Sequence, residues 1–157
     1  MAEPIPATSG TIDGGVHVYP VRVYYDDTDA AGIVYYANYL RMAERARTEM
    51  LRMIGVQHTE LASHDGVSIA VSRCEVDYIR PARLDDDLQI RTRITALGGA
   101  TMWAEQIVRR AGADLVRLTV RLACIGPGGR AARFPKALRA AMEEFRAADQ
   151  SLAREGA

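Results

Sequence analysis

The sequence predicts an α+β domain in which one curved antiparallel sheet of about five strands packs its apolar face on a long helix. The expected order is strand, long helix, four strands and a terminal helix. Short glycine-containing turns join the later strands, so these strands must be antiparallel, unlike those of a parallel βαβ fold. With 157 residues, 48% of them hydrophobic, the chain can bury one core. We therefore expect a single domain over residues 16–150.

The two ends of the chain are predicted to lie outside this domain. Residues 1–15 are rich in Pro, Gly, Ser and Thr, so we expect a flexible N-terminal arm, and residues 151–157 are expected to form a C-terminal tail. The N-terminus lacks the basic start and apolar centre of an export signal, and no later segment approaches the roughly 18 apolar residues of a spanning helix. Cys74 and Cys124 lie in apolar strand-like stretches, as free buried thiols do. These features predict a cytoplasmic protein without stable membrane insertion.

The first half of the domain is expected to hold one strand and the long helix. Residues 16–25, VHVYPVRVYY, alternate β-branched and aromatic residues, and Pro20 indicates an edge position or a bulge. Residues 38–54 have apolar residues at helical spacing, and Gly55 is placed to end that helix. The helical stripe consists of Leu40, Ala43, Ala46 or Arg47, Met50 and Ile54.

The second half is expected to hold four strands and a closing helix. In residues 67–79 the apolar alternation changes from odd to even positions, which predicts a long strand with a bulge or strong twist. LQIRTRITA, TMWAEQIVRR and LVRLTVRLACI follow as alternating runs, separated by Gly98-Gly99 and by residues 112–114. GPGGR indicates a turn, and KALRAAMEEFRAA predicts a C-terminal helix.

Composition and motifs exclude several kinds of function. Twenty acidic residues balance twenty basic ones, so nothing indicates a nucleic-acid partner. The chain has no G-x-S-x-G elbow, no phosphate-binding P-loop and no G-x-G-x-x-G after a strand. His17, His58 and His64 lack the neighbouring ligands of a zinc site, so we expect no metal.

The stretch DDTDAAGIVYYANY, residues 26–39, has two interpretations. Asp and Thr favour turns and helix starts, and Gly32 supplies a permissive backbone, so the stretch suits a polar loop. However, the carboxylates precede an apolar helix entry directly, where free backbone N–H groups and a positive dipole end can bind an oxygen. An aspartate beside such a group is able to attack or to activate water.

The run VRVYYDDTDAAGIVYYANYLRMAERARTEML resembles the signature of hotdog-fold thioesterases of the 4-hydroxybenzoyl-CoA thioesterase class. It is most similar to the YbgC-type acyl-CoA thioesterases associated with Tol-Pal loci. VSRCEVDYIRPARLDDDLQI resembles a second block of the same family, and the resemblance covers roughly residues 18–145. It implies a hotdog fold, hydrolysis of an acyl-CoA substrate without a cofactor, and a homo-oligomer, either dimer or tetramer, with the active site at the dimer interface.

The resemblance also implies roles for individual residues. The second aspartate of the D-T-D unit, Asp29, matches the family's catalytic carboxylate, and it acts there as nucleophile or general base. The backbone N–H of Tyr36 matches the oxyanion donor, although relatives often carry His at this position. Asp27 is expected to be structural and to accept hydrogen bonds from the backbone of the loop. Gly32 and Tyr35 are assigned to substrate binding.

The phosphates of coenzyme A require a local group of cations despite the neutral net charge. Arg83, Arg133 and Lys136 are the assigned binders, and Arg80, Arg109 and Arg110 are further candidates. Each of them alone is equally compatible with a solvated surface charge.

The sequence disfavours one alternative function and leaves another open. A hydratase or dehydratase of the same fold needs a histidine near the long helix, and none lies between Val18 and Gln57. A non-catalytic acyl-binding or scaffold protein is the second alternative, because a fold alone does not specify chemistry.

Overall fold

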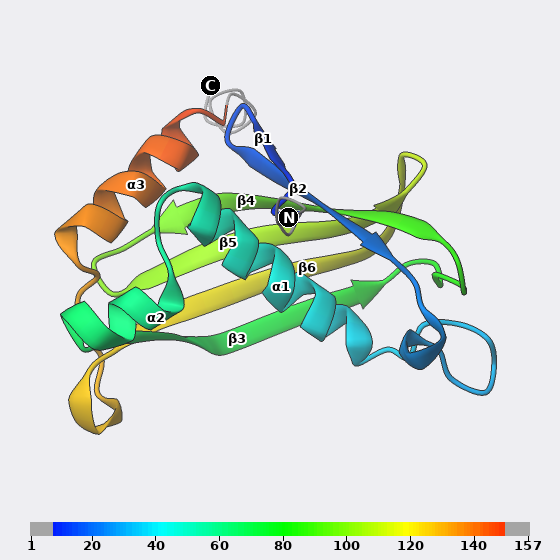
Figure 1. Ribbon diagram of the computed structural model, residues 1–157, viewed down its shortest axis with the longest axis horizontal. Coiled ribbons are helices and arrows are strands. Elements are labelled where there is room, and N and C mark those ends of the chain that lie inside the picture. Colours follow the sequence, from blue (N-terminus) through cyan, green and yellow to red (C-terminus); the bar gives the residue numbers. More distant parts are fainter. Residues whose placement is uncertain (1–7, 150–157) are drawn as a thin grey trace, which may run out of the picture.

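A six-stranded antiparallel sheet curves around one long helix (Figure 1). The computed structural model describes residues 8–149. The strands are ordered β1-β2-β4-β5-β6-β3 across the sheet. Their bounds are β1 Thr11–Asp13, β2 Val16–Arg22, β3 Ser68–Tyr78, β4 Asp87–Leu97, β5 Thr101–Arg110 and β6 Ala113–Ile125. The helices are α1 Asn38–Met53, α2 His58–Glu60 and α3 Lys136–Ala147, with short turns of helix at Tyr25–Asp27, Leu61–Asp65 and Pro127–Gly129.

Helix α1 is the element around which the sheet curves, as the sequence predicts. Its buried residues form one stripe facing the inner side of the sheet, where Ile90, Ile94, Leu118 and Val120 are fully buried. Gly55 follows the helix with a φ of 94°, a conformation that suits glycine. The buried residues of α1 are Tyr39, Met42, Ala43, Ala46, Arg47, Met50 and Leu51.

The expected irregularity of the strand in residues 67–79 is present in β3. The pairing of β3 with β6 shifts register between Val71 and Arg73, and this shift accounts for the change in apolar parity. The neighbour of β3 on one side is β6, and its other edge faces no strand within the described part of the chain. An eleven-residue edge strand is therefore open.

The structure differs from the prediction at β1, which lies within the expected flexible arm of residues 1–15. Thr11 to Asp13 pair with Val16 to Val18, and Gly14 and Gly15 both have positive φ angles, as a two-residue hairpin turn requires. All three residues of β1 are exposed, so no apolar alternation indicated a strand. Residues 1–7 of the arm and the tail at 151–157 lie outside the described residues.

Helix α3 confirms the predicted terminal helix and packs over β4 at one end of the sheet (Figure 1). It buries Leu138, Met142 and Phe145 on one face. The short helical segments over residues 58–65 were not predicted, because they are too short for a 3.6-residue pattern to develop. No helix among residues 8–149 is long and apolar enough to cross a membrane.

A buried histidine on β2 makes stability depend on pH. His17 is fully buried, and its Nε2 lies 2.6 Å from the carbonyl oxygen of Ser9, to which it donates. Burial lowers the pKa of His17, so the unfolded chain takes up a proton more readily than the folded chain. The free energy of unfolding is thus expected to decrease as the pH falls below about 6.5, by at most about 1.4 kcal/mol per pH unit.

Chemical denaturation between pH 7.5 and 5 measures this dependence, with the exposed His64→Gln as the control variant. In His17→Gln the slope attributable to this histidine should disappear, whereas it should persist in His64→Gln. An equal slope in both variants would contradict the assignment to His17.

Candidate active site

The loop between β2 and α1 holds Asp29 in a tight turn. The Asp29 N–H donates to the carbonyl of Ile33 (2.9 Å), and the Gly32 N–H donates to the carbonyl of Asp29 (3.0 Å). The turn requires a φ of 76° at Gly32, and a Cβ added there would meet no atom within 4 Å, so the backbone angle and not crowding favours glycine. One carboxylate oxygen of Asp29, Oδ1, accepts the N–H of Ala31 (2.8 Å). The Asp29 side chain is exposed, so Oδ2 is available to a substrate or water.

Asp27 connects this loop to the start of α1. Its Oδ2 accepts the N–H of Tyr24 (2.8 Å), and its carbonyl accepts both the N–H of Tyr35 (2.9 Å) and Nδ2 of Asn38 (2.9 Å). The expectation that Asp27 accepts hydrogen bonds from the loop backbone is therefore confirmed. Asn38 was not singled out in the sequence, since a single asparagine at a helix start carries no specific signal.

The backbone N–H of Tyr36 lies at the entry to α1. The neighbouring N–H of Tyr35 is bonded to Asp27 and that of Asn38 is bonded to the carbonyl of Tyr35. Among residues 8–149, no acceptor is found for the N–H of Tyr36. An unpaired N–H at the N-terminus of a sixteen-residue helix is a donor for a negatively charged oxygen.

Four tyrosines surround this helix start. The Tyr78 hydroxyl donates to the carbonyl of Tyr36 (3.0 Å), and the two rings meet edge to face. Tyr39 is buried, and its hydroxyl accepts the N–H of Ala82 (3.0 Å). The hydrogen bond with Tyr36 and the charges of Tyr36 and Asp29 raise the pKa of Tyr35. Sequence reasoning missed Tyr78, because its contact with Tyr36 joins residues 42 positions apart.

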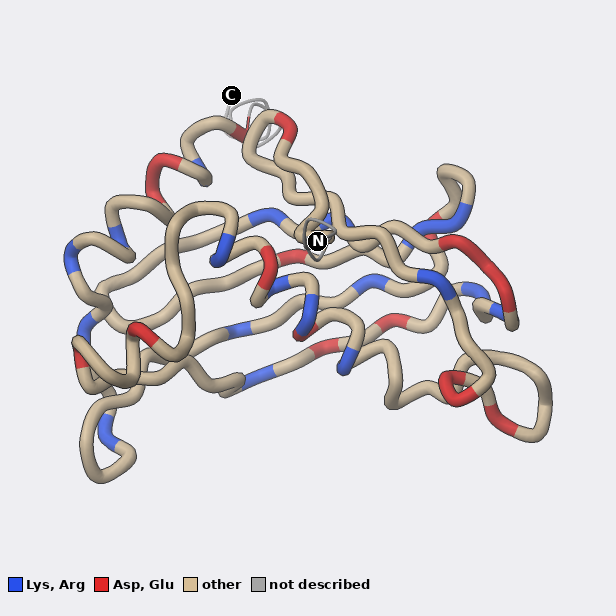
Figure 2. Tube along the Cα trace, viewed as in Figure 1, with Lys and Arg blue, Asp and Glu red and all other residues tan. Residues whose placement is uncertain are grey.

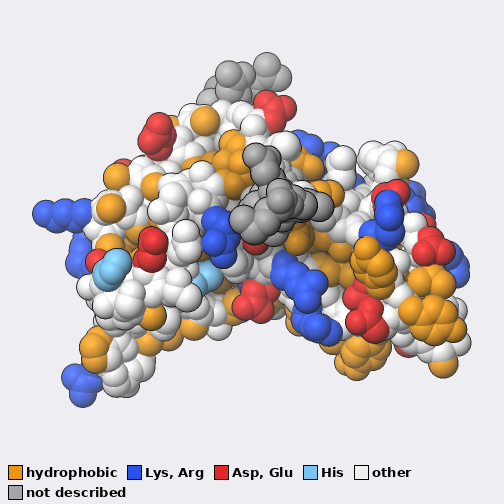
Figure 3. All heavy atoms as spheres, viewed as in Figure 1, with side chains coloured by type: hydrophobic (Ala, Val, Ile, Leu, Met, Phe, Trp, Pro, Cys, Tyr) orange, Lys and Arg blue, Asp and Glu red, His pale blue; other side chains and the backbone are white. Residues whose placement is uncertain are grey.

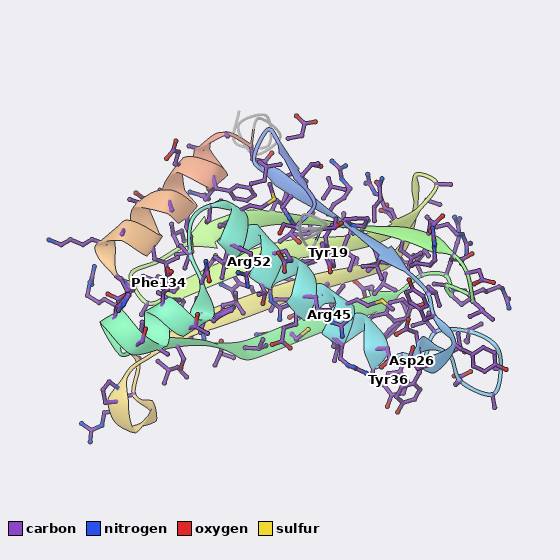
Figure 4. The ribbon with its side chains drawn as sticks, viewed as in Figure 1. Tyr19, Asp26, Tyr36, Arg45, Arg52 and Phe134 are labelled. Carbon is purple, nitrogen blue, oxygen red and sulfur yellow. The ribbon has the colours of Figure 1, made fainter. Side chains whose placement is uncertain are left out.

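The assigned substrate-binding residues lie in two separate places. Gly32 and Tyr35 belong to the loop, and Arg83 lies beside it, paired with Ile33 through a β-bridge. Arg133 has its guanidinium next to Gly99, and Lys136 begins α3, so both lie at the opposite end of the sheet (Figure 4). Figure 4 labels Tyr36 at one end and Phe134, next to Arg133, at the other.

The loop is open on the surface of the protomer. Tyr24, Tyr25, Tyr35 and Tyr36 are all exposed, and Figure 3 shows hydrophobic side chains gathered with acidic ones at this end of the molecule. The acidic positions of the loop lie where α1 begins (Figure 2).

A separate groove of about 560 Å³ runs between β2 and α1, bordered by Asp27, Asn38, Arg41 and Arg45. Asp29 does not line this groove and is exposed, so its carboxylate is open to water in the single protomer.

Comparison with known proteins identifies the family. The model of the thioesterase-like superfamily matches residues 23–142. The chain belongs to this superfamily. It is 40% identical over 129 residues to the acyl-CoA thioesterase YbgC of Haemophilus influenzae, covering 82% of this chain and 95% of that protein. It is 43% identical over 110 residues to the acyl-CoA thioester hydrolase YbgC of Escherichia coli, covering 69% and 81% of the two chains.

A solved structure supports the fold as well. The crystal structure of a probable thioesterase from Bartonella henselae superposes with a TM-score of 0.74 at 40% identity, covering 76% of this chain and 99% of that one. The curved sheet around α1 is therefore the hotdog fold that the sequence resemblance implies. The expected count of about five strands becomes six because of β1.

The structural role of Asp27 leads to a stability prediction. Asp27→Ala removes the acceptor for the Tyr24 N–H, which should lower the free energy of unfolding by about 1 kcal/mol. For a chain of this size the melting temperature should fall by about 2–4 °C. Asp26→Ala is the matched control, because the Asp26 side chain is exposed and makes no hydrogen bond within the described residues. Calorimetry that shows equal melting temperatures for both variants would rule out this role for the Asp27 carboxylate.

Proposed function

We propose that the chain hydrolyses an acyl-CoA thioester to a free carboxylic acid and coenzyme A. The observation that carries this proposal is that one short loop holds both an exposed carboxylate, that of Asp29, and a backbone N–H without an acceptor, that of Tyr36. The two relatives named as acyl-CoA thioester hydrolases support the substrate class. The chain is thus a thioester hydrolase, with Asp29 and the Tyr36 amide as its reacting groups.

The proposed chemistry uses the two groups on the same carbonyl. As the carbonyl carbon is attacked, its oxygen becomes an oxyanion, which accepts the Tyr36 N–H at the positive end of α1. Asp29 either takes a proton from the attacking water or attacks the carbon itself to form an anhydride, which water then hydrolyses. In the first route the carbon–sulfur bond breaks after water has added, and the sulfur leaves as the thiol with the proton that Asp29 took up. In the second route this bond breaks as the anhydride forms, and the thiolate of coenzyme A takes a proton from water. Both roles of Asp29 require its ionised form, and neither requires a cofactor.

In this proposal a second copy of the chain covers the exposed Asp29 carboxylate and excludes water from it. The open edge of β3 suits antiparallel pairing with β3 of a second copy about a two-fold axis. This pairing places the Ser68 end of one strand beside the Tyr78 end of the other. Tyr78 contacts the helix start, whereas Ser68 pairs with Ile125 next to the 126–136 segment.

This arrangement brings the two groups of assigned phosphate binders to one site. Arg83 lies beside the loop of its own protomer, and Arg133 and Lys136 of the second copy approach the same loop. Arg109 and Arg110 are less suitable, because they pair with Asp114 and Asp86. The expectation of two buried thiols is wrong for Cys74, which is exposed on β3, and correct for Cys124. An exposed free thiol also suits a reducing cytoplasm, where we place the protein.

Replacing Asp29 with Asn tests the central role. The amide keeps the size of the side chain and an acceptor for the Ala31 N–H, so the loop should persist. Without the carboxylate charge, kcat/KM for acyl-CoA hydrolysis should fall by about 100-fold or more. A thiol-trapping assay with acyl-CoAs of several lengths and aromatic types measures this, and Asp26→Asn should keep normal activity.

Two outcomes would contradict the proposal in different ways. If folded Asp29→Asn retained normal turnover, the carboxylate would have no catalytic part. If the unaltered protein cleaved none of the acyl-CoAs above the buffer rate, the protein would be a non-catalytic acyl-binding module.

The proposed assembly has its own test. Light scattering at micromolar concentration should give a dimer or a tetramer. Cys74 lies next to the middle of β3 and is exposed, whereas Cys124 is buried, so a short bismaleimide should link two chains through Cys74. Cys74→Ser should abolish the linkage while scattering stays the same. A monomer that still turns over substrate would contradict both the assembly and the shared site.

A further inference from the structure

Arg47 is a buried cation on the helix face that should be apolar. Only 8% of its surface is exposed, and its Nη1 donates to Oε1 of Gln106 (2.8 Å). Gln106 is itself fully buried and donates to the carbonyl of Ala43 and to Oγ1 of Thr92 (both 2.9 Å). These bonds fix the position of the guanidinium in the space between α1 and the sheet.

Glu44 stabilises this charge from one turn earlier on α1, but it forms no direct ion pair with Arg47. Burial lowers the pKa of Arg47, with opposing effects from Glu44 and Cys74, yet a guanidinium stays protonated in proteins. Among residues 8–149, no acidic group forms an ion pair with it. A guanidinium has five N–H donors, and within the described residues only Nη1 of Arg47 makes a hydrogen bond, so the remaining donors can bind an anion in the adjacent space.

That space is a cavity of about 200 Å³ between α1 and β3, with its floor on β6. Five of its nine lining residues are aliphatic, and the polar ones are Arg47, Glu44, Thr48 and His58. Aliphatic walls beside a buried cation suit an apolar chain that ends in an anionic group. The residues used here are Arg47, Thr48, Leu51, His58, Ile69 and Leu122.

We propose that Arg47 binds the ionised far end of the acyl group, so that the preferred substrates are acyl-CoAs whose acyl chain terminates in a carboxylate. This inference rests on the proposed thioesterase function and adds the substrate class. The planar guanidinium can donate two parallel hydrogen bonds to a carboxylate, a geometry that a terminal methyl group cannot use.

The distance along α1 suits this assignment. Arg47 lies eleven residues after Tyr36, which corresponds to about 16 Å along the helix axis. Tyr36, which precedes α1, contacts Tyr78 at the end of β3, and Cys74 of β3 lies close enough to Arg47 to affect it electrostatically. In this proposal an extended acyl chain with its carbonyl at the Tyr36 amide runs along the side of α1 that faces β3 and ends in the cavity.

Three other polar residues line the cavity, namely His58, Thr48 and Glu44. His58 Nε2 lies 3.3 Å from Oγ1 of Thr48 at its rim. Glu44, one turn before Arg47, is exposed, and its negative charge opposes an anionic ligand. Because Glu44 is in water, this repulsion is screened and weaker than the attraction of the buried guanidinium.

Kinetics with matched substrates test the proposal. For each chain length, kcat/KM is measured for one acyl-CoA ending in a carboxylate and one ending in a methyl group. The unaltered protein should prefer the carboxylate by about 10-fold to 100-fold at the best length, mainly through KM. In Arg47→Gln this preference should disappear, and Arg47→Lys should retain part of it. Arg45→Gln, an exposed arginine on the same helix, should leave the ratio unchanged.

A second variant keeps the test decisive if Arg47 variants fail to fold. Glu44→Gln changes only an exposed side chain, and it should raise the preference for the carboxylate by roughly two-fold to five-fold. Hydrolysis without any preference in the unaltered protein, or an unchanged ratio in Glu44→Gln, would overturn the role of Arg47 and leave the thioesterase proposal intact. Absence of hydrolysis with every substrate would overturn both.

Discussion

The hydrogen bonds of Asp27 are the constraint on which the rest of the site depends. Its carboxylate holds the turn after β2, and its carbonyl holds Tyr35 and Asn38 at the start of α1. These bonds use the N–H of Tyr35, and the next N–H, that of Tyr36, has no acceptor among the described residues. The turn of Asp29 is closed by its own bonds with Ile33 and Gly32 and lies between the two segments that Asp27 holds, so Asp27 helps to position both of the proposed reacting groups.

In the proposed mechanism, the helix that begins at this loop also connects the proposed reacting groups to the proposed acyl pocket. One side of α1 is buried against the sheet, and the cavity at Arg47 lies between α1 and β3, nine residues after the helix begins at Asn38. We propose two functions for strand β3, which forms a wall for the acyl chain and leaves an open edge for a second copy. A protomer alone leaves Asp29 exposed, and we therefore regard the paired form as the active one.

The sequence predicted most of the fold because hydrophobic periodicity reports burial directly. Helix α1, the bulge in β3 and the closing helix α3 all followed from it. Strand β1 did not, because three exposed residues carry no such pattern. Arg133 and Lys136 illustrate another limit, since the order of residues along a chain does not reveal which end of a sheet they occupy. Arg47 already stood on the apolar stripe in the sequence, but only the bond to Gln106 shows that it points inward.

The central claim is that the N–H of Tyr36 stabilises the oxyanion, and replacing the peptide bond between residues 35 and 36 with an ester tests it most directly. The ester removes this N–H, keeps the tyrosine side chain and weakens the Tyr35 carbonyl as the acceptor of the Asn38 N–H. Because the Tyr36 N–H itself has no acceptor within residues 8–149, the melting temperature should fall only slightly. The account predicts that kcat for acyl-CoA hydrolysis falls by about 100-fold to 1,000-fold. An ester variant with normal kcat would contradict it.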